Sequence, residues 1–90
     1  MREMVYEKAV PLADEDGRRF DLVRVYAEEM PGGTWQGWIE FRSAEGTSVT
    51  TDRETTQSTR EAVAYWATGL EPVFLEGALR RAATAASHRR

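Results

Sequence analysis

The sequence predicts a small α+β domain, in which a three- to four-stranded antiparallel meander is followed by two C-terminal helices packed on one face of the sheet. Two observations support this fold class. Short runs of alternating apolar and polar residues, separated by turn residues, fill the first half of the chain. Beyond residue 57 the apolar period lengthens from two to about 3.6, which is typical of helices. Short turns between consecutive strands favour antiparallel pairing.

Four segments carry the strand pattern: residues 4–10, 20–29, 35–42 and a short, weak one at 48–52. Pro11 closes the first segment, because proline cannot donate to a strand ladder. The Asp16-Gly17 pair predicts the tip of the first hairpin. The second segment gives the strongest signal, since β-branched and aromatic residues occur throughout it.

Two helices are predicted after the strands. The first spans residues 59–68, with Ser58 as its N-cap, Glu61 completing a capping box, and Gly69 ending it as a C′ glycine. Pro72 occupies the first position of the second helix. The apolar stripe of that helix runs to about residue 86 through Leu75, Leu79, Ala82 and Ala86. We therefore expect a single domain over residues 1–86 and a flexible basic tail at 87–90.

Strand alternation assigns the two faces of the sheet. The core sets are Trp35, Gly37, Ile39 and Phe41 in the third segment and Val23, Val25 and Ala27 in the second. The outer set consists of Leu22, Arg24, Tyr26, Trp38 and Arg42. Phe20 shares the parity of this outer set.

Tryptophan, tyrosine and arginine are enriched at the centres of protein interfaces, and a monomer rarely exposes this much apolar area. We therefore expect the outer face to self-associate, as in a homodimer, or to bind a protein partner. One alternative is that the second helix folds back over Trp38. Another is that the face stacks the bases of single-stranded nucleic acid or binds another ligand. The acidic neighbours Glu28, Glu29 and Glu40 count against nucleic acid.

A second candidate site is the hydroxyl-rich stretch that enters the first helix. Its residues are Arg53, Thr55, Thr56, Ser58, Thr59 and Arg60. Backbone N–H groups at the helix N-terminus, with hydroxyls and two arginines, predict binding of a phosphate or similar anion. The alternative is a capped, solvated loop whose threonines bond locally, because phosphate-binding glycines are missing.

Composition narrows the remaining classes of function. The chain has no cysteine, and its single histidine, His88, lies in the predicted tail, so we expect no enzyme activity, no metal site and no cofactor. The net charge of −3 is not that of a protein with a dominant basic face for duplex DNA. Without an apolar run of membrane-spanning or signal-peptide length, we expect a cytoplasmic protein that does not bind membranes.

Three segments resemble a set of short, uncharacterised bacterial proteins: WQGWIEF at residues 35–41, RETTQ at 53–57 and AYWATGLEPVFLEGAL at 64–79. The resemblance implies no activity. The order of a meander followed by helices is also similar to HicB-like antitoxin domains, which pair with a toxin, although no motif is shared. Together these observations predict a non-enzymatic interaction module, with a binder of single-stranded nucleic acid or a phosphate ligand as the alternative.

Overall fold

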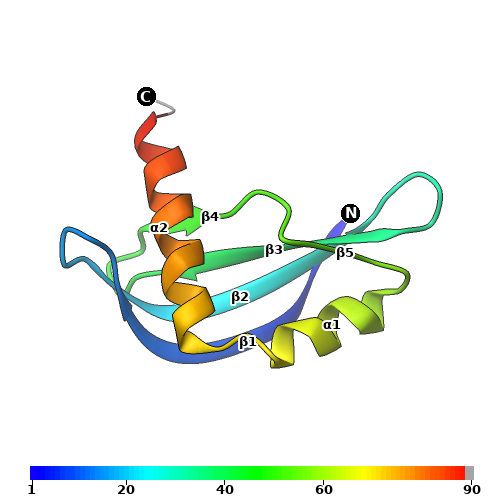
Figure 1. Cartoon of the computed structure of the whole chain (residues 1–90), viewed down its shortest axis with the longest axis horizontal. Helices are drawn as coiled ribbons and strands as arrows, with labels where there is room; N and C mark the ends of the chain where they lie inside the picture. Colours follow the sequence, from blue (N-terminus) through cyan, green and yellow to red (C-terminus); the bar gives the residue numbers. More distant parts are fainter. Residues whose placement is uncertain (89–90) are drawn as a thin grey trace.

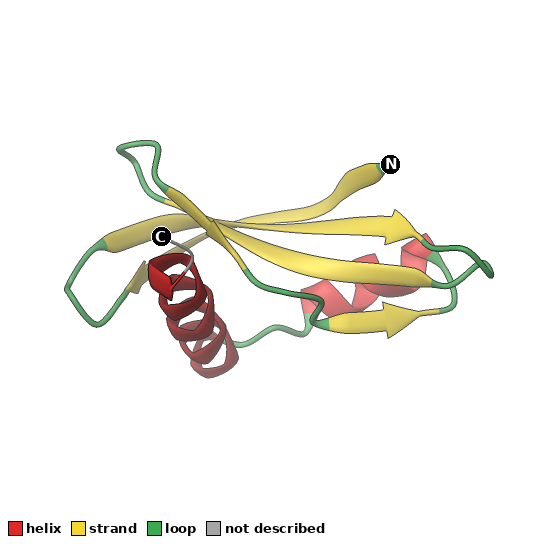
Figure 2. Cartoon of the chain, turned by 90° about the horizontal axis from the view of Figure 1, so that it is seen from above, coloured by secondary structure: helices red, strands yellow, loops and turns green. Residues whose placement is uncertain are grey.

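The computed structural model describes residues 1–88 and confirms the α+β fold class. The strands are β1 (Arg2–Ala13), β2 (Arg19–Glu29), β3 (Trp35–Arg42), β4 (Ser48–Thr50) and β5 (Thr55–Gln57), and the helices are α1 (Arg60–Thr68) and α2 (Pro72–His88). The antiparallel sheet has the order β1-β2-β3-β4, and β5 also pairs with β3. Both helices lie on the same side of this sheet (Figures 1 and 2).

The core lies between the sheet and the two helices. Of the predicted set of β2 and β3, residues such as Val23, Val25, Ile39 and Phe41 are buried, whereas Trp35 is only partly buried against this core. The helices contribute Val63 and Ala67 from α1 and Leu75, Ala78, Leu79 and Ala82 from α2. Ala86, predicted for the stripe of α2, is exposed, and Ala78 is buried in its place. No helix among residues 1–88 is long and apolar enough to cross a bilayer.

β1 is longer than predicted, because Pro11 does not end it. The strand continues to Ala13, and its pairing with β2 shifts between Ala9 and Leu12, so Pro11 lies in a bulge. β1 is also an edge strand, where the missing N–H of proline costs no ladder hydrogen bond. The predicted hairpin tip is confirmed: Gly17 has φ of +81° and donates its N–H to the carbonyl of Asp14 at 3.0 Å.

A second bulge changes the face on which Met4 lies. The register pairs Met4 with Tyr26 and Tyr6 with Val25, so one extra β1 residue stands between them. Met4 and Tyr6 share a parity in the sequence, but the extra residue turns their side chains to opposite faces. Met4 therefore points away from the helices, beside Tyr26.

Phe20 departs from its predicted parity. It has the parity of Leu22, yet it is fully buried, opposite Leu12, which is also buried. Because β3 ends at Arg42, opposite Leu22, β1 and β2 continue past this row as a two-stranded ribbon. Such ribbons twist more than wider sheets, and a bulge adds twist. This end of the hairpin curls toward α2 (Figure 1).

The far edge of the sheet is formed by β4 and β5, with a short excursion between them. β4 ends at Thr50, two residues earlier than predicted, and β5 arises in a stretch predicted as loop. Thr51 joins the two pieces: its N–H donates to the carbonyl of Ile39 at 2.9 Å, and its Oγ1 accepts from the N–H of Ile39 at 3.1 Å. Glu54 N–H then donates to the carbonyl of Gly37 at 2.8 Å.

The helix boundaries differ slightly from the predictions. The N-cap of α1 is Thr59, not Ser58; its hydroxyl accepts from the N–H of Ala62 at 3.0 Å, so the predicted capping box does not form. Gly69 does end the helix, but with φ of −94°, outside the left-handed region. Pro72 begins α2 as predicted, and the helix continues to His88. Residues 89–90 of the predicted tail lie outside the described part of the chain.

Candidate functional site

The face of the sheet opposite the helices is the candidate site, and we call it the open face. Its residues, from the register of β1, β2 and β3, are Arg2, Met4, Glu7, Ala9, Leu22, Arg24, Tyr26, Glu28, Gln36, Trp38, Glu40 and Arg42. All five residues predicted for the outer face are among them. Because α2 packs on the other side, it does not cover Trp38 (Figure 2). This structure therefore removes the alternative in which the second helix hides the face.

An aromatic row crosses the middle of the open face. Tyr26 of β2 and Trp38 of β3 are direct cross-strand partners, and Met4 of β1 is the partner of Tyr26 on its other side. Met4 is 47% exposed, while the two rings are half-buried. The guanidinium of Arg2 accounts for part of this cover: its Cζ lies 5.7 Å from the centre of the Tyr26 ring and 5.3 Å from that of Trp38. The rings thus already hold a cation.

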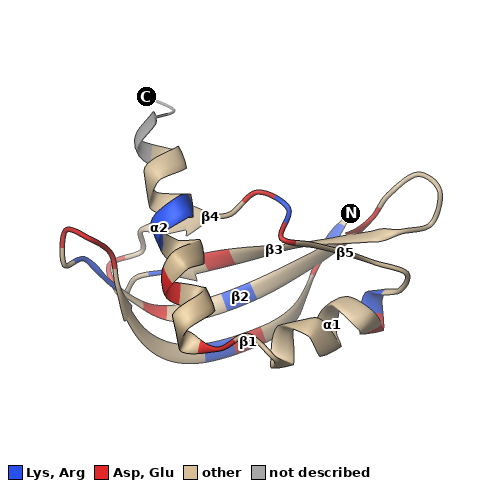
Figure 3. Ribbon diagram, viewed as in Figure 1, with Lys and Arg blue, Asp and Glu red and all other residues tan. Residues whose placement is uncertain are grey.

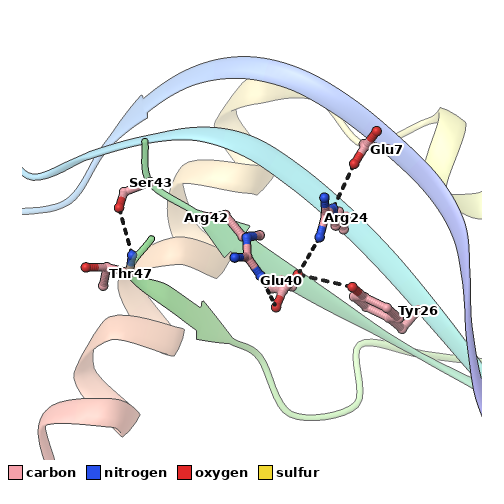
Figure 4. A network of polar contacts seen from close by, with 7 residues as sticks. All are labelled: Glu7, Arg24, Tyr26, Glu40, Arg42, Ser43 and Thr47. Carbon is pink, nitrogen blue, oxygen red and sulfur yellow. Dashed lines mark hydrogen bonds and ion pairs between the residues drawn. The ribbon is translucent and has the colours of Figure 1, made fainter. Parts of the chain in front are cut away.

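A network of charged side chains lies beside the aromatic row (Figure 4). Glu40 is at its centre, with a side chain only 15% exposed. It accepts a hydrogen bond from the hydroxyl of Tyr26 at 3.3 Å, and its carboxylate lies 3.9 Å from Arg24 Nη1 and 3.6 Å from Arg42 Nη1. Arg24 Nε also donates to Glu7 at 2.7 Å. That hydrogen bond, with a further contribution from Tyr26, raises the pKa of Arg24 above its ordinary value.

The network orients the aromatic row and neutralises the arginines next to it. Each of Arg24 and Arg42 lies against at least one carboxylate, so their charges are already compensated within the chain. Ion pairs that are partly exposed add little stability individually. Their effect here is geometric, because shared contacts on Glu40 hold Tyr26 in place beside Trp38.

The predicted outer set contained no residue of β1, whereas the register places Arg2, Met4, Glu7 and Ala9 on this face. Arg2 and Met4 precede the bulge after Met4, and Glu7 and Ala9 follow it. Alternation alone puts Met4 and Tyr6 together, so no local signal would have separated them. Alternation in the sequence places Glu40 on the same face as Trp38, but it does not reveal the contacts of Glu40 with Tyr26 and Arg24, because both belong to another strand.

The predicted anion site lies along β5 and the start of α1. Thr55 belongs to β5, and its Oγ1 accepts a hydrogen bond from Gln57 Nε2 at 2.6 Å. Thr59 uses its hydroxyl to cap α1, and Arg60 Nε donates to Glu3 at 2.8 Å. Arg53, Thr56 and Ser58 are exposed. The hydroxyl of Thr59 and the guanidinium of Arg60 are thus engaged within the chain, and anion binding at the helix start stays a prediction.

Among residues 1–86, whose side chains the structure describes, no three His, Cys, Asp or Glu side chains cluster in a way that could hold a metal ion. No buried side-chain nitrogen or oxygen in the same range is left without a hydrogen-bond partner. Comparison with known proteins adds no assignment: no family model, no curated protein and no solved structure matches this chain. The resemblance to short bacterial proteins and to HicB-like domains accordingly stays a prediction.

Proposed function

We propose that this protein is a non-enzymatic interaction module that self-associates through the open face. The observation that carries the proposal is the aromatic row of Met4, Tyr26 and Trp38 on a sheet face that both helices leave uncovered. Methionine, tyrosine, tryptophan and arginine are the residues most enriched at interface centres relative to ordinary surface.

The dimensions of the molecule support a face-to-face contact. Seen along its shortest axis the molecule measures 40 by 28 Å, and the sheet lies broadly in this plane (Figure 1). A stable interface of standard size buries about 800 Å² per partner. The open face runs across β1, β2 and β3, and both helices lie on the other side of the sheet.

The charges of the open face also favour association with a second copy. The face carries three arginines, Arg2, Arg24 and Arg42, and three glutamates, Glu7, Glu28 and Glu40. It is therefore electrically balanced, although the whole chain has a net charge of −3. Two copies that meet through this face bring together no excess of like charge.

Association through the edge of the sheet is less well supported than association through its face. β1 is a long edge strand, but two bulges interrupt it and Lys8 lies between them. Bulges and edge lysines are the devices that prevent strands from pairing between molecules. Nucleic-acid binding is also less well supported. Basic and acidic positions are interspersed along the strands (Figure 3), and Arg24 and Arg42 already contact carboxylates.

Sedimentation velocity over a concentration series, from about one to several hundred micromolar, tests the proposal. We expect the wild type to shift from monomer to dimer across this range. Trp38→Ala should remain monomeric, because truncating a central tryptophan costs about 2 kcal/mol or more of binding energy. The matched control is Tyr65→Ala, which removes an aromatic ring 81% exposed on α1, on the opposite side of the molecule. A wild type that stays monomeric throughout, or a Tyr65→Ala variant that loses association equally, contradicts the proposal.

A further inference from the structure

The aromatic row on the open face holds a guanidinium group in the monomer. The Arg2 guanidinium lies over the rings of both Tyr26 and Trp38. The face of an aromatic ring carries negative potential, so a planar cation is the group that such a pair attracts most strongly. A second positive group, the amino group of Met1, lies 3.5 Å from Glu28 in the next row. This part of the surface therefore has the chemistry of a cation site.

The carboxylates on either side strengthen this character. In the sheet register the Tyr26–Trp38 row is flanked by the row of Glu28 and Gln36 on one side and by the row of Arg24 and Glu40 on the other. A cation over the rings thus has one acidic side chain in each neighbouring row, of which Glu40 is also paired with Arg24. A guanidinium fits better than an ammonium, because it stacks flat on a ring while its N–H groups still reach carboxylates at the edge.

Arg2 is held more weakly than Arg24 and Arg60. Arg24 and Arg60 each donate a hydrogen bond of 2.7 to 2.8 Å to a carboxylate, whereas the contacts of Arg2 are with the two rings. Arg2 is also exposed. A second copy cannot touch the rings unless this side chain moves, and the rings then need a group of the same chemistry to replace it.

We propose that Tyr26 and Trp38 form a binding site for an arginine side chain, that Arg2 is its resident occupant in the monomer, and that an arginine of a second copy takes its place on association. The inference rests on the proposed function for the identity of the second copy. The site itself can be tested in the monomer. Arg2 then acts as an internal competitor, whose removal opens the site.

The experiment is a titration of dilute, monomeric protein followed by the indole N–H signals in proton–nitrogen NMR spectra. Trp35, Trp38 and Trp66 each give one signal, and the signal lost in Trp38→Phe identifies Trp38. The probe is N-acetyl-arginine amide, and the control is N-acetyl-citrulline amide, a neutral molecule of nearly the same shape, at matched ionic strength. In Arg2→Ala we expect the arginine probe to move the Trp38 signal and the citrulline probe to leave it in place. The wild type should need about two to five times more arginine probe for the same movement of the Trp38 signal. Arg2 competes with the probe for the rings, and one exposed cation–π contact lowers the apparent affinity by about that factor.

Two results overturn the inference: no movement of the Trp38 signal in Arg2→Ala, or equal movement with citrulline. Unchanged Trp35 and Trp66 signals in the variant show that the fold is intact. Sedimentation separates this inference from the proposed function. Wild-type association without arginine binding refutes the arginine site alone. Arginine binding by a chain that stays monomeric at all concentrations supports the site and refutes its occupation by a second copy.

Discussion

Replacing Gly37 with alanine tests how closely the sheet and α1 approach each other. Gly37 is buried in the middle of β3, between Ala27 of β2 and Thr55 of β5. A Cβ atom at this position would lie 2.8 Å from Val63 Cγ1 and 2.9 Å from Thr55 Cγ2. Carbon atoms in favourable contact are about 3.5–4.0 Å apart. The glycine is therefore required by the space that Val63 occupies, because its own φ is not positive.

The expected cost follows from two opposing terms. Overpacking a well-packed core typically costs about 1–3 kcal/mol. Alanine recovers about 0.5–1 kcal/mol relative to glycine in a strand, since it loses less backbone entropy on folding. We therefore expect Gly37→Ala to lower the free energy of unfolding by about 1–2 kcal/mol, and to lower the Tm by about 5–15 °C for a domain of this size.

Urea unfolding at constant m-value measures this change, and two further variants make it specific. Val63→Ala alone should cost about 2 kcal/mol for the lost methyl groups and the cavity. Combined with Gly37→Ala it should cost less than the sum by about 1 kcal/mol or more, because the new methyl group fills the vacated space. Gly77→Ala in α2 is the matched control: nothing lies within 4 Å of its Cβ position, and it should stabilise the protein by about 0.5–1 kcal/mol. If Gly37→Ala leaves stability unchanged, or if the two substitutions add without coupling, the packing argument is wrong.

Three other predictions address the remaining contacts and the edge of the sheet. Thr51→Val should lower the free energy of unfolding by about 1–3 kcal/mol in urea unfolding, because the buried N–H of Ile39 loses its acceptor; a neutral result would show that another group replaces the hydroxyl. Arg81→Ala should cost about 1–2 kcal/mol, since Arg81 makes a two-point contact with a Glu54 side chain only 7% exposed, at 2.7 and 3.1 Å. Arg80→Ala, which breaks a largely exposed pair with Glu15 at 3.6 Å, should cost less than about 1 kcal/mol in the same assay, and equal losses would contradict this ranking. Lys8→Val should increase light scattering on storage, because it removes the one lysine of the chain from the middle of the β1 edge; Lys8→Arg should behave as wild type, and no difference between the two would show that the bulges alone protect the edge.

Met4 and Phe20 are the residues at which alternation alone does not give the correct face of the sheet. Alternation placed Val23, Val25, Ile39 and Phe41 in the core correctly, because β2 and β3 pair without a bulge over their whole shared length. In β1 the same rule failed. A bulge depends on how a strand pairs with the residues opposite it, and the sequence of β1 alone does not determine that pairing. Phe20 was misplaced for a related reason, since the curl of a two-stranded ribbon depends on where β3 stops.

The predicted site residues likewise divide into placements that the sequence could give and contacts that it could not. Parity, together with the expected burial of the β-branched residues of β2, assigned one face to Leu22, Arg24, Tyr26, Trp38 and Arg42, and the structure places them there. The sequence could not show that Arg2 lies over the rings of Tyr26 and Trp38. Both rings are more than twenty positions away from Arg2 in the sequence, and a bulge in β1 affects the register. Nor could it show that Thr59 and Arg60 of the predicted anion site use their polar groups within the chain.

By itself the sequence determined the fold class, the core set of β2 and β3, and the start of α2 at Pro72, because these follow from local periodicity and from the fixed φ of proline. Only the tertiary structure decided that α2 covers the core face and leaves Trp38 uncovered. An apolar stripe states that a helix must be buried, but it does not state against which surface. The helix lies on the core face because Leu75, Ala78, Leu79 and Ala82 pack with the buried apolar residues of the sheet. The aromatic row was left facing outward, beneath a single arginine.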